Sequence, residues 1–89
     1  MPSAKPKKSK HYNARSFQVA LGEHCYRLRI KKGFSVNRLA SEAEMSPSVV
    51  MRLEKGTAPV NVATLLRYAR VLGVTVKALF DFAWDDDES

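Results

Sequence analysis

Residues 35–56 read SVNRLASEAEMSPSVVMRLEKG, and this stretch decides the fold. Ser35 and Ser46 each precede a short run of helix-compatible residues, where a serine hydroxyl accepts a hydrogen bond from a backbone N–H of the first helical turn. Pro47 follows Ser46 at the first helical position, where its missing N–H costs nothing. Gly56 suits a helix end because glycine adopts the left-handed backbone conformation. The stretch therefore predicts two short helices, joined by a turn around Met45.

Further helices are predicted on both sides of this stretch. One helix begins near Phe17 and ends at Gly33, and its apolar face recurs at steps of four, four and three residues, at Phe17, Leu21, Cys25 and Leu28. Asn61 caps a fourth helix that ends at Gly73, with predicted buried residues Leu65, Leu66, Ala69 and Leu72. Thr75 caps a last short helix through Leu79 and Phe80. No long segment alternates with period two, so the predicted fold class is all-α.

The ordered motifs resemble those of the phage-repressor-like (Xre/Cro) helix-turn-helix family. They are Leu-Ala at 39–40, a small-residue turn, Ser-x-x-x-Val at 46–50, Leu-Glu-x-Gly at 53–56 and Leu-Gly-Val at 72–74. The resemblance covers roughly residues 21–80 and implies a compact five-helix bundle of the lambda-repressor-like type. It also implies that helix 46–55 enters the DNA major groove and that the protein binds a palindromic operator as a homodimer. The function that follows is a sequence-specific transcription regulator acting as a repressor.

Composition limits the other classes of function. The chain has 89 residues, enough for one small domain, and a net charge of +6, which favours a polyanionic partner such as double-stranded DNA. No apolar run is long enough to span a membrane, and no signal peptide opens the chain, so we expect a soluble cytoplasmic protein associated with the nucleoid. One cysteine and two histidines provide no zinc site, and no catalytic motif is present. We therefore expect no enzyme activity, metal, cofactor or small-molecule ligand.

The charge is distributed unevenly along the chain. Residues 1–80 contain all fifteen Lys and Arg with four of the nine acids, whereas residues 81–89 contain five acids and no base. The predicted organisation is a disordered basic N-terminal arm at 1–16, the helix-turn-helix domain at 17–82 and an acidic C-terminal tail at 83–89. The arm could follow the DNA backbone or enter a minor groove, or it could merely make the chain more soluble.

The third predicted helix carries the candidate base contacts. At 100° per residue, Val50 and Leu53 face inward, while Ser48, Met51, Arg52 and Lys55 share the opposite face. Arg52 could bond guanine, Ser48 could bond either base type, and Met51 could touch a thymine methyl. Phosphate contacts are predicted for four residues: Lys31, Lys32, Arg38 and Lys55. Without the resemblance, a solvated helix face would explain the same pattern.

Some positions depart from the family pattern. Val36 replaces a common polar residue at the start of the second helix, and Thr57 and Ala58 are neutral where the family often has Lys or Arg. These departures leave two alternatives open. One is an antitoxin or other protein-interaction module on the same fold, and the other is a nonspecific DNA-binding protein.

The resemblance also implies one structural pair and leaves one interface open. Arg29 and Glu54 match family positions where an arginine of the first helix meets the glutamate that ends the recognition helix. At the other end of the chain, apolar residues gather within a short segment, and an exposed cluster of this kind is typical of an interface. The predicted homodimer seam consists of Val76, Phe80, Phe82 and Trp84. In the alternative, Phe82 and Trp84 fold back over the first helix.

Overall fold

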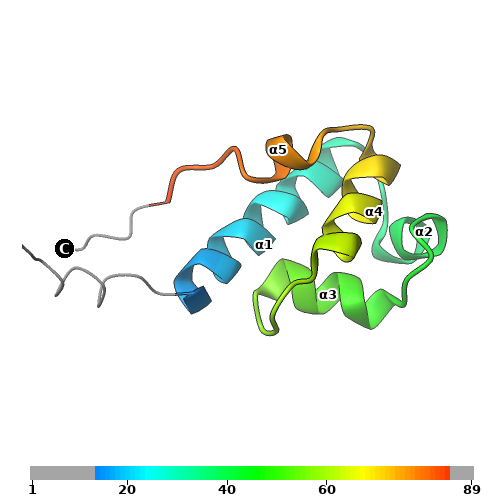
Figure 1. The fold of residues 1–89 in the computed structure, drawn as a ribbon. Coiled ribbons are helices and arrows are strands. Elements are labelled where there is room, and N and C mark those ends of the chain that lie inside the picture. The colour runs from blue at the N-terminus through cyan, green and yellow to red at the C-terminus, as the bar shows by residue number, and fades with distance from the viewer. Residues whose placement is uncertain (1–13, 85–89) are drawn as a thin grey trace, which may run out of the picture.

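A computed structural model describes residues 14–84, which contain five α-helices and no strand. The helices are α1 (Ala14–Lys31), α2 (Val36–Glu42), α3 (Pro47–Lys55), α4 (Val62–Leu72) and α5 (Val76–Leu79). In Figure 1, α3 lies below the long α1 and α4 lies to its right, α2 closes the right-hand end of the bundle, and α5 lies above α1. The all-α prediction is confirmed.

Local caps explain where the four shorter helices begin. The side chains of Ser35, Ser46, Asn61 and Thr75 each accept a hydrogen bond from the backbone N–H three residues later. Gly56 and Gly73 end α3 and α4 in the left-handed conformation. These starts and ends agree with those predicted from the sequence. Helix α1, in contrast, begins at Ala14, so residues 14–16 of the predicted arm form its first turn. The rest of the arm and residues 85–89 of the acidic tail lie outside the described residues.

The core consists of apolar side chains from all five helices. Leu21 and Cys25 of α1 meet Leu39 of α2, Val50 and Leu53 of α3, and the buried face of α4. One prediction about this face is wrong. Leu66 was expected to be buried but is 54% exposed, whereas Tyr68 is fully buried. Tyr68 follows Leu65 by three residues and precedes Leu72 by four, so it lies on the inward side of α4 and Leu66 does not.

Glycine at position 22 lets α1 and α3 cross closely. A Cβ added to Gly22 would overlap the carbonyl oxygens of Leu53 and Glu54 at the end of α3. Helix α3 packs mainly against α1 and α2, so this close crossing sets the position of α3 relative to the rest of the bundle. The crossing therefore positions the helix that carries the candidate base contacts.

The turn between α2 and α3 contains Glu44, whose φ is +58°. Among the non-glycine residues of 14–84, Glu44 alone has a positive φ. An L-residue in this conformation places its Cβ close to the next carbonyl group. The turn was predicted to consist of small residues. Ala43 is small and fully buried, but the residue that adopts the left-handed conformation is a glutamate.

Candidate nucleic-acid interface

Helix α3 presents two chemically different faces. Val50 and Leu53 are buried in the core, while the side chains predicted to contact bases and phosphate are exposed. The exposed set comprises Ser48, Met51, Arg52 and Lys55. Ser48 approaches the capping residue Ser46, with 3.2 Å between the two hydroxyl oxygens. The exposed face thus combines a hydroxyl, a thioether and two cations, a set that could bond base edges, thymine methyl groups and phosphates.

The predicted phosphate contacts outside α3 are also exposed. Lys31 ends α1, and Lys32 follows it in the turn before α2. Arg38 lies in α2, where its Nε donates to Glu42 Oε2 at 3.0 Å and its guanidinium lies 4.2 Å from the centre of the Phe34 ring. An exposed pair of this kind contributes little stability, so Arg38 can exchange Glu42 for a phosphate at small cost.

Arg29 and Glu54 form a buried ion pair between α1 and α3. Arg29 donates to both carboxylate oxygens of Glu54, with distances of 2.7 Å from Nε to Oε2 and 2.9 Å from the terminal nitrogen to Oε1. A third bond of 2.9 Å joins Arg29 to the Phe34 carbonyl oxygen. Both side chains are only 7% exposed. The hydrogen bond to Glu54 raises the pKa of Arg29, so the pair stays charged.

Tyr68 completes this buried network, a role that the sequence pattern did not indicate. Its hydroxyl donates to Glu54 Oε2 at 2.5 Å and also lies 3.0 Å from the Cys25 carbonyl oxygen, the second acceptor within reach. Burial and the bond to Glu54 raise the pKa of Tyr68 above its ordinary value. The signal that could have revealed Tyr68 is its place on the same helical face as Leu65 and Leu72.

Cys25 lies beside this network and is fully buried. Burial, together with the negative charge of Glu54, raises the pKa of its thiol to about 12. The thiol therefore remains protonated at neutral pH. No group of three His, Cys, Asp or Glu residues within 14–84 is arranged to hold a metal ion. Over the same range, no helix is long and apolar enough to cross a membrane.

The aromatic residues near the C-terminus pack largely within the chain. Phe82 lies 5.5 Å from Phe17 between ring centres, and Trp84 meets Phe17 edge-to-face at 5.0 Å. The Trp84 indole N–H also donates to Ser16 Oγ at 3.2 Å. Phe82 and Trp84 therefore fold back over α1, which is the alternative to the predicted seam, and they bury part of the apolar surface of α1. Val76 is half-buried, whereas Phe80 stays 39% exposed.

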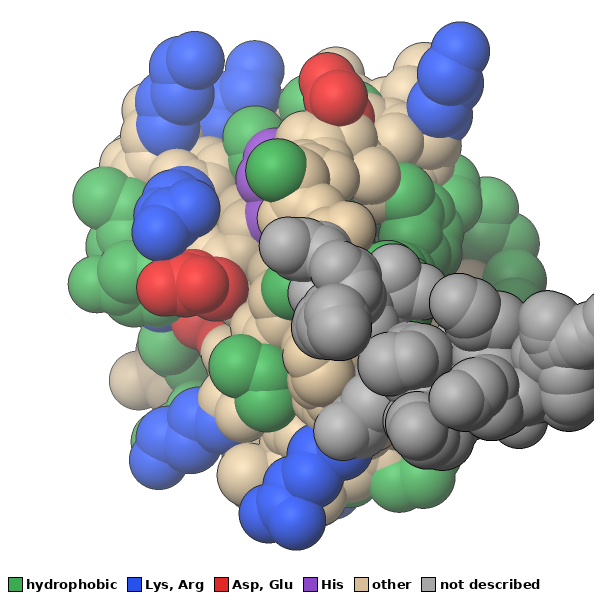
Figure 2. Space-filling model, turned by 90° about the vertical axis from the view of Figure 1, so that its left-hand side faces the viewer, with side chains coloured by type: hydrophobic (Ala, Val, Ile, Leu, Met, Phe, Trp, Pro, Cys, Tyr) green, Lys and Arg blue, Asp and Glu red, His purple; other side chains and the backbone are tan. Residues whose placement is uncertain are grey.

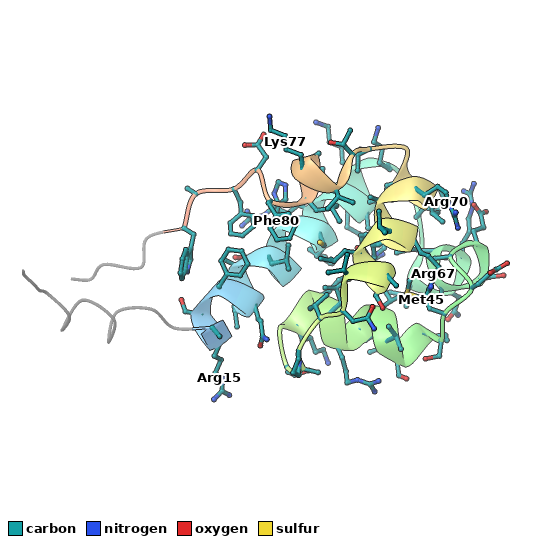
Figure 3. All side chains as sticks on the ribbon, viewed as in Figure 1. Arg15, Met45, Arg67, Arg70, Lys77 and Phe80 are labelled. Atoms are coloured by element: carbon teal, nitrogen blue, oxygen red, sulfur yellow. The ribbon has the colours of Figure 1, made fainter. Side chains whose placement is uncertain are left out.

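A different set of apolar side chains is exposed near Phe80. Val62 and Leu66 lie one turn apart on α4, and both are well exposed. Val62 and Phe80 line a groove of about 280 Å³ whose floor includes Phe17 and Leu21. Figure 3 shows Phe80 at the end of α5, above α1. In Figure 2, which views the bundle from the end where α1 begins, Lys and Arg side chains are spaced around the rim and do not form one patch.

Comparison with known proteins identifies the family. Residues 26–79 match the family model HTH_3, described as Helix-turn-helix. The chain is 42% identical over 67 residues to the HTH-type transcriptional regulator RamB of Mycobacterium tuberculosis, a match that covers 75% of this chain but only 14% of that relative.

Two solved structures share the fold. The clp gene regulator ClgR of Corynebacterium glutamicum superposes with a TM-score of 0.68 and 28% identity, over 71% of this chain and 67% of that one. The restriction-modification controller protein C.AhdI of Aeromonas hydrophila gives a TM-score of 0.69 and 30% identity, over 71% of this chain and 96% of that one. Together with the two capped helices and the exposed face of α3, these matches show that the chain belongs to the lambda-repressor-like helix-turn-helix family of DNA-binding domains.

Proposed function

We propose that the chain is a sequence-specific DNA-binding transcription regulator that inserts α3 into the major groove. The observation that carries this proposal is the exposed face of α3. Ser48, Met51, Arg52 and Lys55 project from a helix that is anchored on its other face by Val50 and Leu53. The bidentate Arg29–Glu54 pair ties the end of that helix to α1, and a rigid recognition helix loses less entropy on binding. The similarity to proteins named as regulators supports the same function.

Within this proposal, three side chains read bases and four bind phosphates. Arg52 donates to guanine O6 and N7, Ser48 bonds a base edge, and Met51 makes an apolar contact. Lys31, Lys32, Arg38 and Lys55 contact the backbone, which contributes affinity without sequence information. The basic arm adds charge close to the DNA. Deletion of residues 2–12 should therefore flatten the dependence of log K on log salt, whereas an unchanged slope would reject a contribution from the arm.

The proposed regulator acts as a homodimer on a palindromic operator and represses by occupying a promoter, within the cytoplasm and on the nucleoid. Phe82 and Trp84 already pack on Phe17, so we assign the contact with a second copy to the exposed apolar residues Val62, Leu66 and Phe80, and keep the half-buried Val76 as a candidate. Sedimentation at tens of micromolar tests this face. A dimer that dissociates in Leu66→Ala/Phe80→Ala, but not in the control Val19→Ala, supports it. A monomeric parent chain would reject it.

The decisive experiment is selection of binding sites from random double-stranded DNA. We expect an enriched palindrome whose half-sites are about ten base pairs apart. Arg52→Ala should relax the preference at one base pair per half-site by about 1–3 kcal/mol. Arg70→Ala is the matched control, because Figure 3 shows Arg70 at the end of α4 away from α3. Tight binding with a steep salt dependence but no enrichment would indicate a nonspecific binder, and absence of DNA binding would favour the protein-interaction module.

A further inference from the structure

An apolar groove of about 300 Å³ lies between α1, the start of α2 and the exposed face of α3. Its walls are Tyr26 of α1, Val36 of α2 and Met51 of α3, with Arg29 and Glu54 beneath and Lys55 at the rim. Tyr26 is 47% exposed and Met51 is 44% exposed. The groove therefore presents apolar surface beside the residues that the proposed function assigns to base contacts.

The two buried charged side chains of this groove, Arg29 and Glu54, bond each other. The Arg29 guanidinium bonds both oxygens of Glu54 and the Phe34 carbonyl, and Tyr68 bonds the same carboxylate from the core side. Arg29 also lies 5.3 Å from the centre of the Tyr26 ring, which holds that ring in place as a wall. A ligand of the groove thus gains mainly apolar contact there.

Helix α3 and its surroundings narrow the choice of ligand. Arg52 and Lys55 lie on the same helix face as Met51, and these cations suit a polyanion. In the DNA major groove, the apolar group that a base offers is the 5-methyl group of thymine. Val36 packs against the core and is fixed, whereas the unbranched thioether of Met51 can adapt its shape to a methyl group.

Resting on the proposed function, we infer that the Tyr26–Val36–Met51 groove is a subsite for the 5-methyl group of a pyrimidine. In unmodified DNA the group belongs to thymine, and the subsite distinguishes thymine from cytosine in each half-site. The same methyl group on 5-methylcytosine fits equally well, since it occupies the same position on the ring. Val36, at a position where the family commonly has a polar residue, thereby gains a role in specificity.

The test uses the enriched operator, with thymines replaced one at a time by deoxyuridine, which keeps every hydrogen-bonding group and lacks only the methyl. In each half-site, one thymine position should be sensitive, and a single replacement there should weaken binding about four-fold, the effect of one buried methyl group. With Met51→Ala, the thymine and deoxyuridine probes should bind equally. At the same position, cytosine should bind more weakly than 5-methylcytosine. Ile30→Ala is the control, because Ile30 is an exposed apolar residue outside the groove and should keep full sensitivity to the methyl.

The outcomes separate this subsite from the proposed function. An operator that binds tightly but is indifferent to every deoxyuridine replacement would overturn the subsite alone, and is the result expected if the groove serves a protein partner. Full methyl sensitivity in Met51→Ala and in Val36→Ser would also overturn it. Failure to enrich any sequence would reject the proposed function and the subsite together. Met51→Leu, which keeps an apolar side chain, should retain the sensitivity and shows that loss in Met51→Ala does not come from misfolding.

Discussion

The Tyr68 hydroxyl lies 2.5 Å from Glu54 Oε2, so α4 holds the same carboxylate that Arg29 of α1 holds in two hydrogen bonds. Three helices thus meet at one buried charge, located at the end of α3. A carboxylate removed from water in this way is stable only while its partners are present.

Tyr68→Phe removes one hydroxyl from the network and leaves the ring in the core. Hydrogen bonds to charged groups contribute about 1.5–3 kcal/mol, so the free energy of unfolding should fall by that amount. Urea or thermal denaturation measures the change. Tyr26→Phe is the control, since Tyr26 is half-exposed, and it should be nearly neutral. Equal stability of the two variants would show that the Tyr68–Glu54 bond contributes nothing.

The Arg29–Glu54 pair should be strongly non-additive. Glu54→Leu or Arg29→Met alone leaves one buried charge without its partner and should cost about 3–5 kcal/mol. The double variant should cost less than the sum, because both charges are then absent. The exposed pair Arg38–Glu42 provides the control cycle and should couple by no more than about 0.5 kcal/mol. If the single variants do not fold, Glu54→Gln measures the cost of the charge at nearly constant shape. Additive losses at Arg29 and Glu54 would contradict the arrangement.

Stability should fall in alkaline solution because of Cys25. Its thiol has an ordinary pKa of 9.0, which burial raises to about 12 in the folded chain. As the pH rises, the unfolded chain therefore loses this proton before the folded chain does. The contribution of the thiol to the free energy of unfolding is complete below pH 9 and decreases as the pH rises towards 12. Burial of Tyr68 acts in the same direction. Denaturant midpoints between pH 7.5 and 10.5 measure the decrease, which should be smaller in Cys25→Ala. An identical pH dependence in that variant would exclude Cys25 as a cause.

Glu44→Gly should stabilise the chain. The left-handed conformation of Glu44 costs roughly 1–2 kcal/mol, which glycine avoids. Glycine gains about 0.5–1 kcal/mol of conformational freedom when unfolded, so the net stabilisation should be up to about 1.5 kcal/mol. Glu44→Ala removes the same charge but keeps a Cβ, and therefore should not stabilise. If both variants gain equally, the cause is the charge and not the backbone conformation.

Much of the fold could be predicted because short-range chemistry determines it. The caps Ser35, Ser46, Asn61 and Thr75 bond a backbone N–H three residues away, and Gly56 and Gly73 end helices through their own backbone freedom. The outward face of α3 follows in the same way from the 3.6-residue repeat. Start and end of each short helix, and the side of α3 available to a partner, therefore depend on residues that lie close together in the chain.

Only the tertiary structure decided how these helices share their polar groups and apolar faces. Tyr68 meets Glu54 and Cys25 across fourteen and forty-three residues, and Trp84 reaches Ser16 across sixty-eight. From the sequence alone, Leu66 is predicted to be buried on α4, whereas in the structure Tyr68 is buried and Leu66 is exposed. The sequence also leaves open whether Phe82 and Trp84 fold back over α1. The physical reason is that helical periodicity defines a face to within about one residue, whereas packing against other helices selects which side chain on that face is enclosed.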